Sequence, residues 1–362
     1  MYCSEERKKF STLFVASIWV NGWLVAHIID CVFQLKLFNK MKAAFRSKYG
    51  LSDVLSIQEF EIPIPKDNEL LIKVYATTVN RTDCHILWGR PFFMRLFTGL
   101  FKPRLAITGT DFAGQIEAIG STVKSFKVGD KVIGFDGMFG CGSHAQYFTF
   151  PETKALKAII RMPDNITYDQ AAACIEGAFY ALNCVLTMNP KSGQKALVIG
   201  ATGAIGSSTV QFLKLYGTHI TAVCRGENSE LVRSLGADKI IDYTTDDFTK
   251  DSGKYDFVFD SIGKNSFFKC KPLLKKNGMF TSSGGFENLF LVLITPLLGG
   301  KKVVFRTPKN IREGLSFIRD LVEKGSFKPV IDRKYPIDKI AEAFEYVGTG
   351  QKIGNVIIIM DT

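Results

Sequence analysis

The sequence predicts an α/β protein with two domains, one rich in β-strands and one built on a doubly wound parallel sheet. A length of 362 residues is enough for about two domains. From Met41 to about Pro163, short strand patterns alternate with turns, as in a barrel-like domain. From Lys195 onward, apolar strands alternate with helices, which favours parallel strands with helices on both faces.

The composition excludes several classes of protein. With 46% hydrophobic and 22% charged residues, the chain is not a disordered one. The net charge is +11, but basic and acidic residues are interspersed, whereas a nucleic-acid footprint needs basic residues clustered on one face. We therefore expect no nucleic-acid partner. Eight cysteines without a CxxC pair argue against a disulfide framework and indicate a reducing compartment.

The first 40 residues form a separate extension. Residues 10–29 contain no Asp, Glu, Lys or Arg, and 20 residues are long enough to cross a bilayer as a helix. Three basic residues precede this segment and five follow it, which favours leaving the rest of the chain in the cytoplasm. Two interpretations stay open: a membrane tether formed by residues 10–29, or a true start at Met41.

The β-rich portion and the region after it are read from strand and helix patterns. Strands are expected over residues 70–79, 110–120, 127–135 and 144–150. The character changes near Pro163, and helices are expected over residues 167–174 and 178–187.

The second half alternates regularly between the two element types. Strands are expected over residues 195–199, 219–223, 240–241, 256–260, 279–282, 302–305 and 354–360. Helices are expected over residues 204–216, 229–235, 266–274, 311–324 and 338–347.

The strongest chemical signal is the run LVIGATGAIGSS, in which a buried strand leads through a glycine turn into a helix. Gly203 would let the backbone approach a pyrophosphate, and Gly206 would let the helix pack closely on the sheet. The usual G-x-G-x-x-G pattern starts here with Ala201 in place of glycine. The dinucleotide contacts are expected from Gly200, Ala201, Thr202, Gly203, Ala204, Ile205 and Gly206.

The end of the next strand indicates which nicotinamide cofactor is used. An NAD site normally places an acid there for the ribose 2′-hydroxyl, but this chain has Cys224 followed by Arg225. Arg225 could pair with a 2′-phosphate, so we expect NADPH in preference to NADH. In the alternative, Arg225 is merely exposed and Glu227 contacts the ribose.

The stretches NRTDCHILWG, TGTDFAGQIEAIG, FKVGDKVIGF, GSHAQY and YDFVFDSIG, together with the glycine turn, resemble the medium-chain dehydrogenase/reductase superfamily, zinc-free quinone oxidoreductase-like branch. The resemblance implies a GroES-like catalytic domain over residues 41–164 and a Rossmann dinucleotide-binding domain over residues 165–306. Residues 307–362 would largely return to the catalytic domain. A homodimer or homotetramer is also implied.

The resemblance assigns further site residues. Asn80 and Asp83 would lie near the nicotinamide ribose or the acceptor as catalytic residues, although they could instead cap a helix. Tyr243 would border the adenosine side, and Ser261 and Gly284 would meet the nicotinamide half.

Zinc is not expected. Where zinc-dependent members carry a cysteine ligand, this chain has Asn80, and their Gly-His-Glu reads Gly109-Thr110-Asp111 here. The pairs Cys141 with His144 and Cys84 with His85 offer too few convergent ligands for a metal.

Without a Lewis acid, hydride transfer from NADPH to a small-molecule acceptor, a quinone or an α,β-unsaturated carbonyl, is the expected reaction. An alcohol dehydrogenase using other ligands and a non-catalytic NADPH-binding protein are the alternatives. The apolar residues 91–101 and 289–298 could meet a lipophilic acceptor, or serve core packing or a subunit contact.

Overall fold

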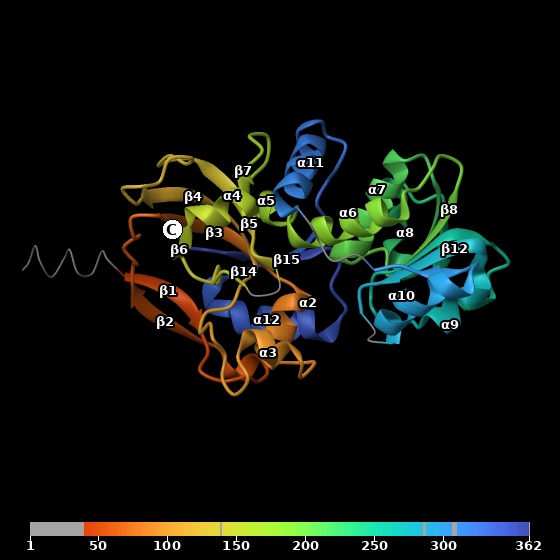
Figure 1. Cartoon of the computed structure of the whole chain (residues 1–362), viewed down its shortest axis with the longest axis horizontal. Helices are drawn as coiled ribbons and strands as arrows, with labels where there is room; N and C mark the ends of the chain where they lie inside the picture. The colour runs from red at the N-terminus through yellow and green to blue at the C-terminus, as the bar shows by residue number, and fades with distance from the viewer. Residues whose placement is uncertain (1–39, 138–139, 285–286, 306–309, 362) are drawn as a thin grey trace, which may run out of the picture.

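The computed structural model describes residues 40–137, 140–284, 287–305 and 310–361, which form two lobes joined by helices (Figure 1). The tether expected over residues 10–29 lies outside the described residues. The β-rich lobe carries β3 to β7 and both terminal strands β1 and β15, while the second lobe carries β8 to β13.

The β-rich lobe is organised around β3 (Glu69–Val79), whose alternating and then continuous burial reflects its central place in a seven-stranded sheet. The strands β14 and β15 pair in parallel, and the other described pairs are antiparallel. Because Val356 of β15 pairs with Val79 of β3, the end of the chain is part of this sheet. The sheet order is β14 (Ile331–Pro336), β15 (Asn355–Ile359), β3, β4 (Asp111–Ile119), β5 (Lys131–Phe135) and β7 (Ile159–Arg161), with β6 (Tyr147–Pro151) also on β3.

A hairpin and several short helices complete this lobe. The hairpin consists of β1 (Lys40–Phe45) and β2 (Ser56–Glu61). The helices are α2 (Arg81–Trp88), α3 (Met94–Thr98), α4 (Glu152–Ala158) and α12 (Ile340–Thr349). The core between sheet and helices is aliphatic and aromatic, with Leu70, Ile72, Phe112 and Ile358 fully buried.

The second lobe is the expected doubly wound sheet. Its strand order is β10-β9-β8-β11-β12-β13, and every pair is parallel. This is the Rossmann order, in which the chain reverses its direction of travel beside the first strand, β8, and ligands bind at the carboxyl ends of the strands there. The strands are β8 (Lys195–Ile199), β9 (His219–Cys224), β10 (Lys239–Asp242), β11 (Tyr255–Asp260), β12 (Leu274–Ser282) and β13 (Lys302–Val303). The accompanying helices are α7 (Ala204–Leu215), α8 (Ser229–Ser234), α9 (Phe267–Cys270) and α10 (Glu287–Leu298).

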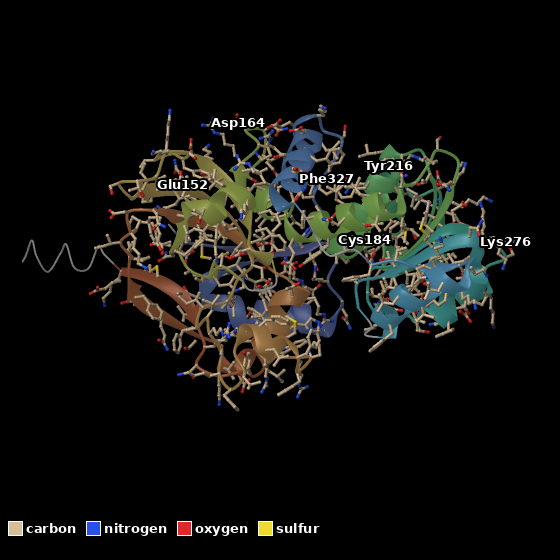
Figure 2. The ribbon with its side chains drawn as sticks, in the orientation of Figure 1. Glu152, Asp164, Cys184, Tyr216, Lys276 and Phe327 are labelled. Carbon is tan, nitrogen blue, oxygen red and sulfur yellow. The ribbon has the colours of Figure 1, made fainter. Side chains whose placement is uncertain are left out.

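Three helices lie where the lobes meet: α5 (Tyr168–Ala172), α6 (Glu176–Met188) and α11 (Ile311–Glu323) (Figure 1). Phe327, which follows α11, stacks on Phe212 of α7 with ring centroids 5.1 Å apart, and Figure 2 places it beside these helices. Residues 168–188 are long and apolar enough to span a membrane, but 78% of that stretch is buried inside the fold. The apolar character of this stretch therefore reflects its place in the core of the molecule.

Most of the expected elements are present with shifted ends, and a few expectations were wrong. The helix expected over residues 266–274 is only α9 and a following 3-10 turn, because Pro272 has no N–H to continue an α-helix. The strand expected from residue 144 begins at Tyr147. Residues 289–298 belong to a helix, α10, and the strands β1, β2 and β14 were not expected.

The approach of α7 to β8 depends on Gly206. A Cβ at this position would lie 2.1 Å from the carbonyl oxygen of Gly200, closer than any side chain tolerates. At Gly203 the nearest atom to such a Cβ is 3.7 Å away, and its φ of −70° suits any residue. The helix can therefore begin this close to the strand only with glycine at 206.

We expect Gly206→Ala to lower the free energy of unfolding by about 2–3 kcal/mol, because α7 must move away from β8. The matched variant Gly203→Ala should cost less than about 1 kcal/mol, the difference between these residues at a helix N-cap. Urea denaturation followed by circular dichroism measures both values. Equal destabilisation by the two variants would contradict this account of the turn.

Candidate active site at the junction of the lobes

The residues predicted to bind the dinucleotide gather at one edge of the parallel sheet. Gly200 follows β8, Arg225 follows β9, Tyr243 follows β10 and Ser261 follows β11, all at carboxyl ends. Gly284 lies two residues beyond β12 and packs closely against Gly263. A Cβ added to Gly263 would be only 2.9 Å from the Gly284 Cα. Because the strands are parallel, their carboxyl ends share the edge at which such folds bind nucleotides.

The glycine turn fits a diphosphate. Gly200 has a φ of 76°, which lets the chain turn sharply from β8 toward α7. No side chain caps the N-terminus of α7, and even a Cβ on Gly203 would meet nothing closer than the Gly200 carbonyl oxygen at 3.7 Å. Free backbone N–H groups and the positive end of the helix dipole suit an anion at this point. The binding role of these residues stays a prediction.

Arg225 and Tyr243, predicted from different strands, meet in the structure. The Arg225 Nε donates a hydrogen bond to the Tyr243 hydroxyl at 2.9 Å, and both side chains are about half exposed. The Glu227 carboxylate lies 3.8 Å from the Arg225 guanidinium. Glu227, the alternative candidate for contact with the ribose, is therefore next to Arg225. Asp242, which the sequence analysis did not single out, accepts hydrogen bonds from the Thr244 amide and hydroxyl nearby.

Asn80 and Asp83 form a capping box at the start of α2. The backbone N–H of Asn80 donates to Asp83 Oδ2 at 2.8 Å, and Asn80 is the N-cap. This is the capping arrangement that the sequence analysis left open beside a catalytic role. Asp83 is fully buried, and its Oδ1 has no hydrogen-bond partner among the described residues.

The side-chain amide of Asn80 donates a hydrogen bond to Glu176, a buried carboxylate that was not predicted from the sequence. Its Oε2 accepts from Asn80 Nδ2 at 3.2 Å and from Thr110 Oγ1 at 2.5 Å. Its Oε1 accepts from the Thr82 hydroxyl. The signal was present in the sequence, since Glu176 is the single acidic residue between Asp169 and Glu227.

Glu176 lies next to the glycine turn. A Cβ on its neighbour Gly177 would be 2.8 Å from the Cβ of Ala204, the first residue of α7. The tail of the chain closes the junction from another side, because Gly354 donates its N–H to the Thr202 carbonyl at 2.7 Å. Lys352, two residues earlier, donates to the Gly354 carbonyl at 2.6 Å. The dinucleotide edge, α2, α6 and the tail therefore converge.

Burial changes the acidity of this cluster. It raises the pKa of Asp111 to about 7, although Thr78 and Thr77 donate hydrogen bonds to that carboxylate. It also raises the pKa values of Asp83 and Glu176, and the neighbouring carboxyl groups raise that of Asp83 further. The Lys352 side chain is half-buried, and loss of water around its ammonium lowers its pKa to about 8.

The donors at this junction do not fit zinc. The groups at the positions of the expected metal ligands are the Asn80 amide and the Thr110 hydroxyl, whereas zinc prefers thiolate and imidazole. His144 is occupied by Thr108 Oγ1 at 2.7 Å and the Thr78 carbonyl at 2.9 Å. Burial lowers its pKa to about 4, so it is neutral and structural. No group of three potential ligands occurs among the described residues.

A groove of about 610 Å³ lies at the opposite edge of the parallel sheet, lined by residues that include Gln194, Asp256 and Lys276. These residues stand at or near the amino ends of β8, β11 and β12, roughly 17 Å from the carboxyl ends. Figure 2 shows Lys276 at the outer end of the second lobe. The groove is not part of the candidate site.

We expect the buried carboxyl of Asp111 to make the folded state less stable as pH rises. Its pKa is about 3.8 when exposed and about 7 when folded, so the stability it contributes is present below about pH 4 and is lost as pH rises through about 7. Between about pH 5 and pH 8, this amounts to about 2–3 kcal/mol.

Urea denaturation at the two pH values measures this effect. The pH-dependent loss should be smaller in Asp111→Asn, whatever the absolute stability of that variant. Asp164→Asn, which removes an exposed carboxylate (Figure 2), should keep the wild-type dependence. An unchanged pH dependence in Asp111→Asn would show that Asp111 is ionised in the folded protein over the whole range.

Comparison with known proteins identifies the family. The chain matches the alcohol dehydrogenase GroES-like domain over residues 66–164 and the zinc-binding dehydrogenase family over residues 235–358. It is 33% identical over 315 residues to the chloroplast envelope quinone oxidoreductase homolog of Arabidopsis thaliana, covering 82% of this chain and 91% of that protein. It is 31% identical over 367 residues to the 2-methylene-furan-3-one reductase of Solanum lycopersicum, covering 98% and 87%.

Two further proteins extend the comparison. The NADPH-dependent alkenal/one oxidoreductase of Arabidopsis thaliana chloroplasts is 32% identical over 330 residues, covering 88% of this chain and 79% of that protein. The fold is shared with the quinone oxidoreductase of Coxiella burnetii, with a TM-score of 0.78 at 24% identity over 89% of this chain and all of that one. The chain belongs to the medium-chain dehydrogenase/reductase superfamily, in its quinone oxidoreductase-like branch.

Proposed function

We propose that this protein is an NADPH-dependent reductase that transfers hydride, without a metal, to a quinone or an α,β-unsaturated carbonyl. One observation carries the proposal: a glycine turn suited to a dinucleotide packs against the start of α6, whose first residue, Glu176, is bonded to a buried amide and hydroxyl. Its relatives include a quinone oxidoreductase homolog and an NADPH-dependent alkenal/one oxidoreductase, so an NAD(P)H-dependent oxidoreductase activity belongs to this chain as well.

Each part of the site has a role in this reaction. The bound nicotinamide cofactor supplies a hydride. The turn from Gly200 to Gly206 holds the diphosphate, and Ser261 and Gly284 at the neighbouring strand ends border the nicotinamide half. Thr82 at the junction orients the acceptor and supplies a hydrogen-bond donor where negative charge develops on its oxygen, and the buried Asn80 holds Glu176 behind it.

The choice of NADPH rests on Arg225. The guanidinium is half exposed and held by Tyr243, so it can turn one edge to a 2′-phosphate while Nε stays bonded. No acidic residue occupies position 224 or 225. Tyr243 fixes the orientation of the fork, which reduces the entropy lost on binding.

Two aspects of the assembly are part of the proposal. The exposed side of α10 carries Phe290, Leu293 and Leu297, each more than two-thirds exposed, next to the edge strand β13. An apolar face beside a sheet edge supports a homodimer or homotetramer. We also propose a cytoplasmic location for the catalytic part, with residues 10–29 as a tether if translation begins at Met1.

We expect the purified protein to oxidise NADPH in the presence of quinones or alkenals and to leave simple aldehydes and alcohols almost unchanged. A spectrophotometric screen over these acceptors with NADPH and NADH measures the activity. An enzyme active on alcohols would favour the alcohol dehydrogenase alternative. NADPH binding with no turnover on any acceptor would favour a non-catalytic binding protein.

Arg225→Asp should lower the preference for NADPH over NADH by about 10- to 100-fold, because a charge-assisted contact worth about 1.5–3 kcal/mol is replaced by repulsion. Ratios of kcat/KM for the two cofactors measure the change. Arg233→Asp makes the same charge change on the exposed side of α8 and should leave the ratio within about twofold. A retained preference in Arg225→Asp would assign cofactor choice to another residue.

Treatment with a strong chelator should leave quinone reductase activity unchanged, because the donors at the junction do not fit zinc. Metal analysis of the purified protein should find well below one zinc per chain. Loss of zinc and activity together, with both restored by added zinc, would overturn the metal-free mechanism.

A further inference from the structure

Glu176 and most of its hydrogen-bond partners are buried, and one partner, Thr82, is partly exposed. Glu176, Asn80 and Thr110 are 3%, 5% and 0% exposed, so none of the three meets a bound acceptor directly. Thr82 is half-buried and keeps exposed surface in the first turn of α2. Among the side chains that donate hydrogen bonds to Glu176, Thr82 is therefore the one that can also contact a molecule at the junction.

The two carboxyl oxygens of Glu176 are bonded unequally. Oε2 accepts from both Asn80 Nδ2 and Thr110 Oγ1, whereas the recorded partner of Oε1 is Thr82 Oγ1 alone. A proton on Glu176 is consequently placed at Oε1, where it displaces one donor rather than two.

The charge on Glu176 decides what Thr82 offers outward. A hydroxyl has one hydrogen, and while Glu176 is ionised Thr82 donates that hydrogen inward, leaving only lone pairs toward the junction. Once Oε1 is protonated it donates to Thr82 Oγ1, and the Thr82 hydrogen becomes free to bond outward. The pair can thus switch Thr82 from acceptor to donor.

We propose that Glu176 is the proton reservoir of the acceptor site and that it acts on the reduced acceptor through the Thr82 hydroxyl. The inference rests on the proposed reductase function and adds a positioning residue and a proton route to it. It accounts for an acidic side chain buried at the start of a core helix, which is costly unless the group is neutral or used.

After hydride has been added to the β-carbon of an enone, the carbonyl oxygen carries the negative charge of an enolate. Thr82 Oγ1 gives its proton to that oxygen and receives the proton of Glu176 Oε1, so the product is a neutral enol and Glu176 is left ionised. The enol converts to the saturated ketone, and Glu176 regains a proton from water before the next turnover.

Several charged groups set the proton affinity of Glu176. Burial raises its pKa, whereas the bonds from Thr110, Thr82 and Asn80 and the positive charge of Lys352 oppose that rise. Asp83 on α2 and Asp111 on β4 face the same cluster and are coupled to it electrostatically. Tyr180 of α6 also faces it: its hydroxyl bonds Thr82, and burial together with the charge of Glu176 raises its pKa. Arg81, which bonds the Gly348 carbonyl, adds a second positive charge near Lys352.

The test compares Glu176→Gln, Thr82→Val and Thr82→Ser with the wild type. For an enone, kcat/KM of the wild type should fall as pH rises through the pKa of Glu176. Glu176→Gln should lower kcat/KM by about 100-fold and remove that pH dependence, the usual range for loss of a general acid. Thr82→Val should resemble it, whereas Thr82→Ser, which keeps the hydroxyl, should retain activity within about threefold.

A second readout does not depend on turnover. Infrared titration of the protein alone should show protonated carboxyl bands, to which Asp111 also contributes, and the band that is missing in Glu176→Gln should disappear over the pH range of the kinetic transition. NADPH affinity, measured by fluorescence, should change less than about threefold in all variants. Glu342→Gln, which removes an exposed carboxylate on α12, should match the wild type in every assay.

The outcomes separate the inference from the proposed function. A wild type without turnover on any quinone or enone overturns the function itself. An active wild type whose pH profile survives in Glu176→Gln, or a Thr82→Val variant as active as Thr82→Ser, overturns the proton route alone. If Glu176→Gln does not fold, the comparison of Thr82→Val with Thr82→Ser decides the question.

Discussion

Close backbone contact at the start of α7 is the constraint on which the rest of the site depends. Gly206 lets the helix begin against Gly200, and Gly177 lets α6 approach Ala204 in the same turn. A side chain at either glycine would separate the elements by the width of a methyl group or more. Because both residues are glycines, the end of β8 and the N-termini of α6 and α7 can pack against one another.

That contact explains why carboxyl groups are buried at the junction. Once α6 is packed this closely, its first residue, Glu176, has no route to solvent and must be bonded by the side chains that surround it, Asn80, Thr82 and Thr110. The exclusion of water that raises the pKa values of the carboxyl groups here also strengthens any electrostatic interaction with a developing oxyanion. Structure and chemistry at this site therefore have a common cause, the removal of water.

Much of the fold could be predicted because its patterns are local. The run 196–199 is uniformly apolar and leads directly into glycines, so the strand, turn and helix were placed with boundaries correct to within one residue. The hairpin β1 and β2 was not expected, because its half-exposed strands alternate weakly and β1 begins at the edge of the apolar extension. The helix expected over residues 266–274 was too long, since Pro272 ends α-helical hydrogen bonding.

By itself, the sequence determined the alternation of strands and helices after residue 195, the glycine turn and the lack of cysteine and histidine where zinc ligands would stand. These features depend on neighbouring residues and on backbone preferences. The tertiary structure alone decided that Arg225 meets Tyr243, that Asn80 caps α2, and that Glu176 lies between Thr82 and Thr110. Those contacts join residues from 3 to 94 positions apart in the chain, and only packing of the two lobes brings the distant ones together.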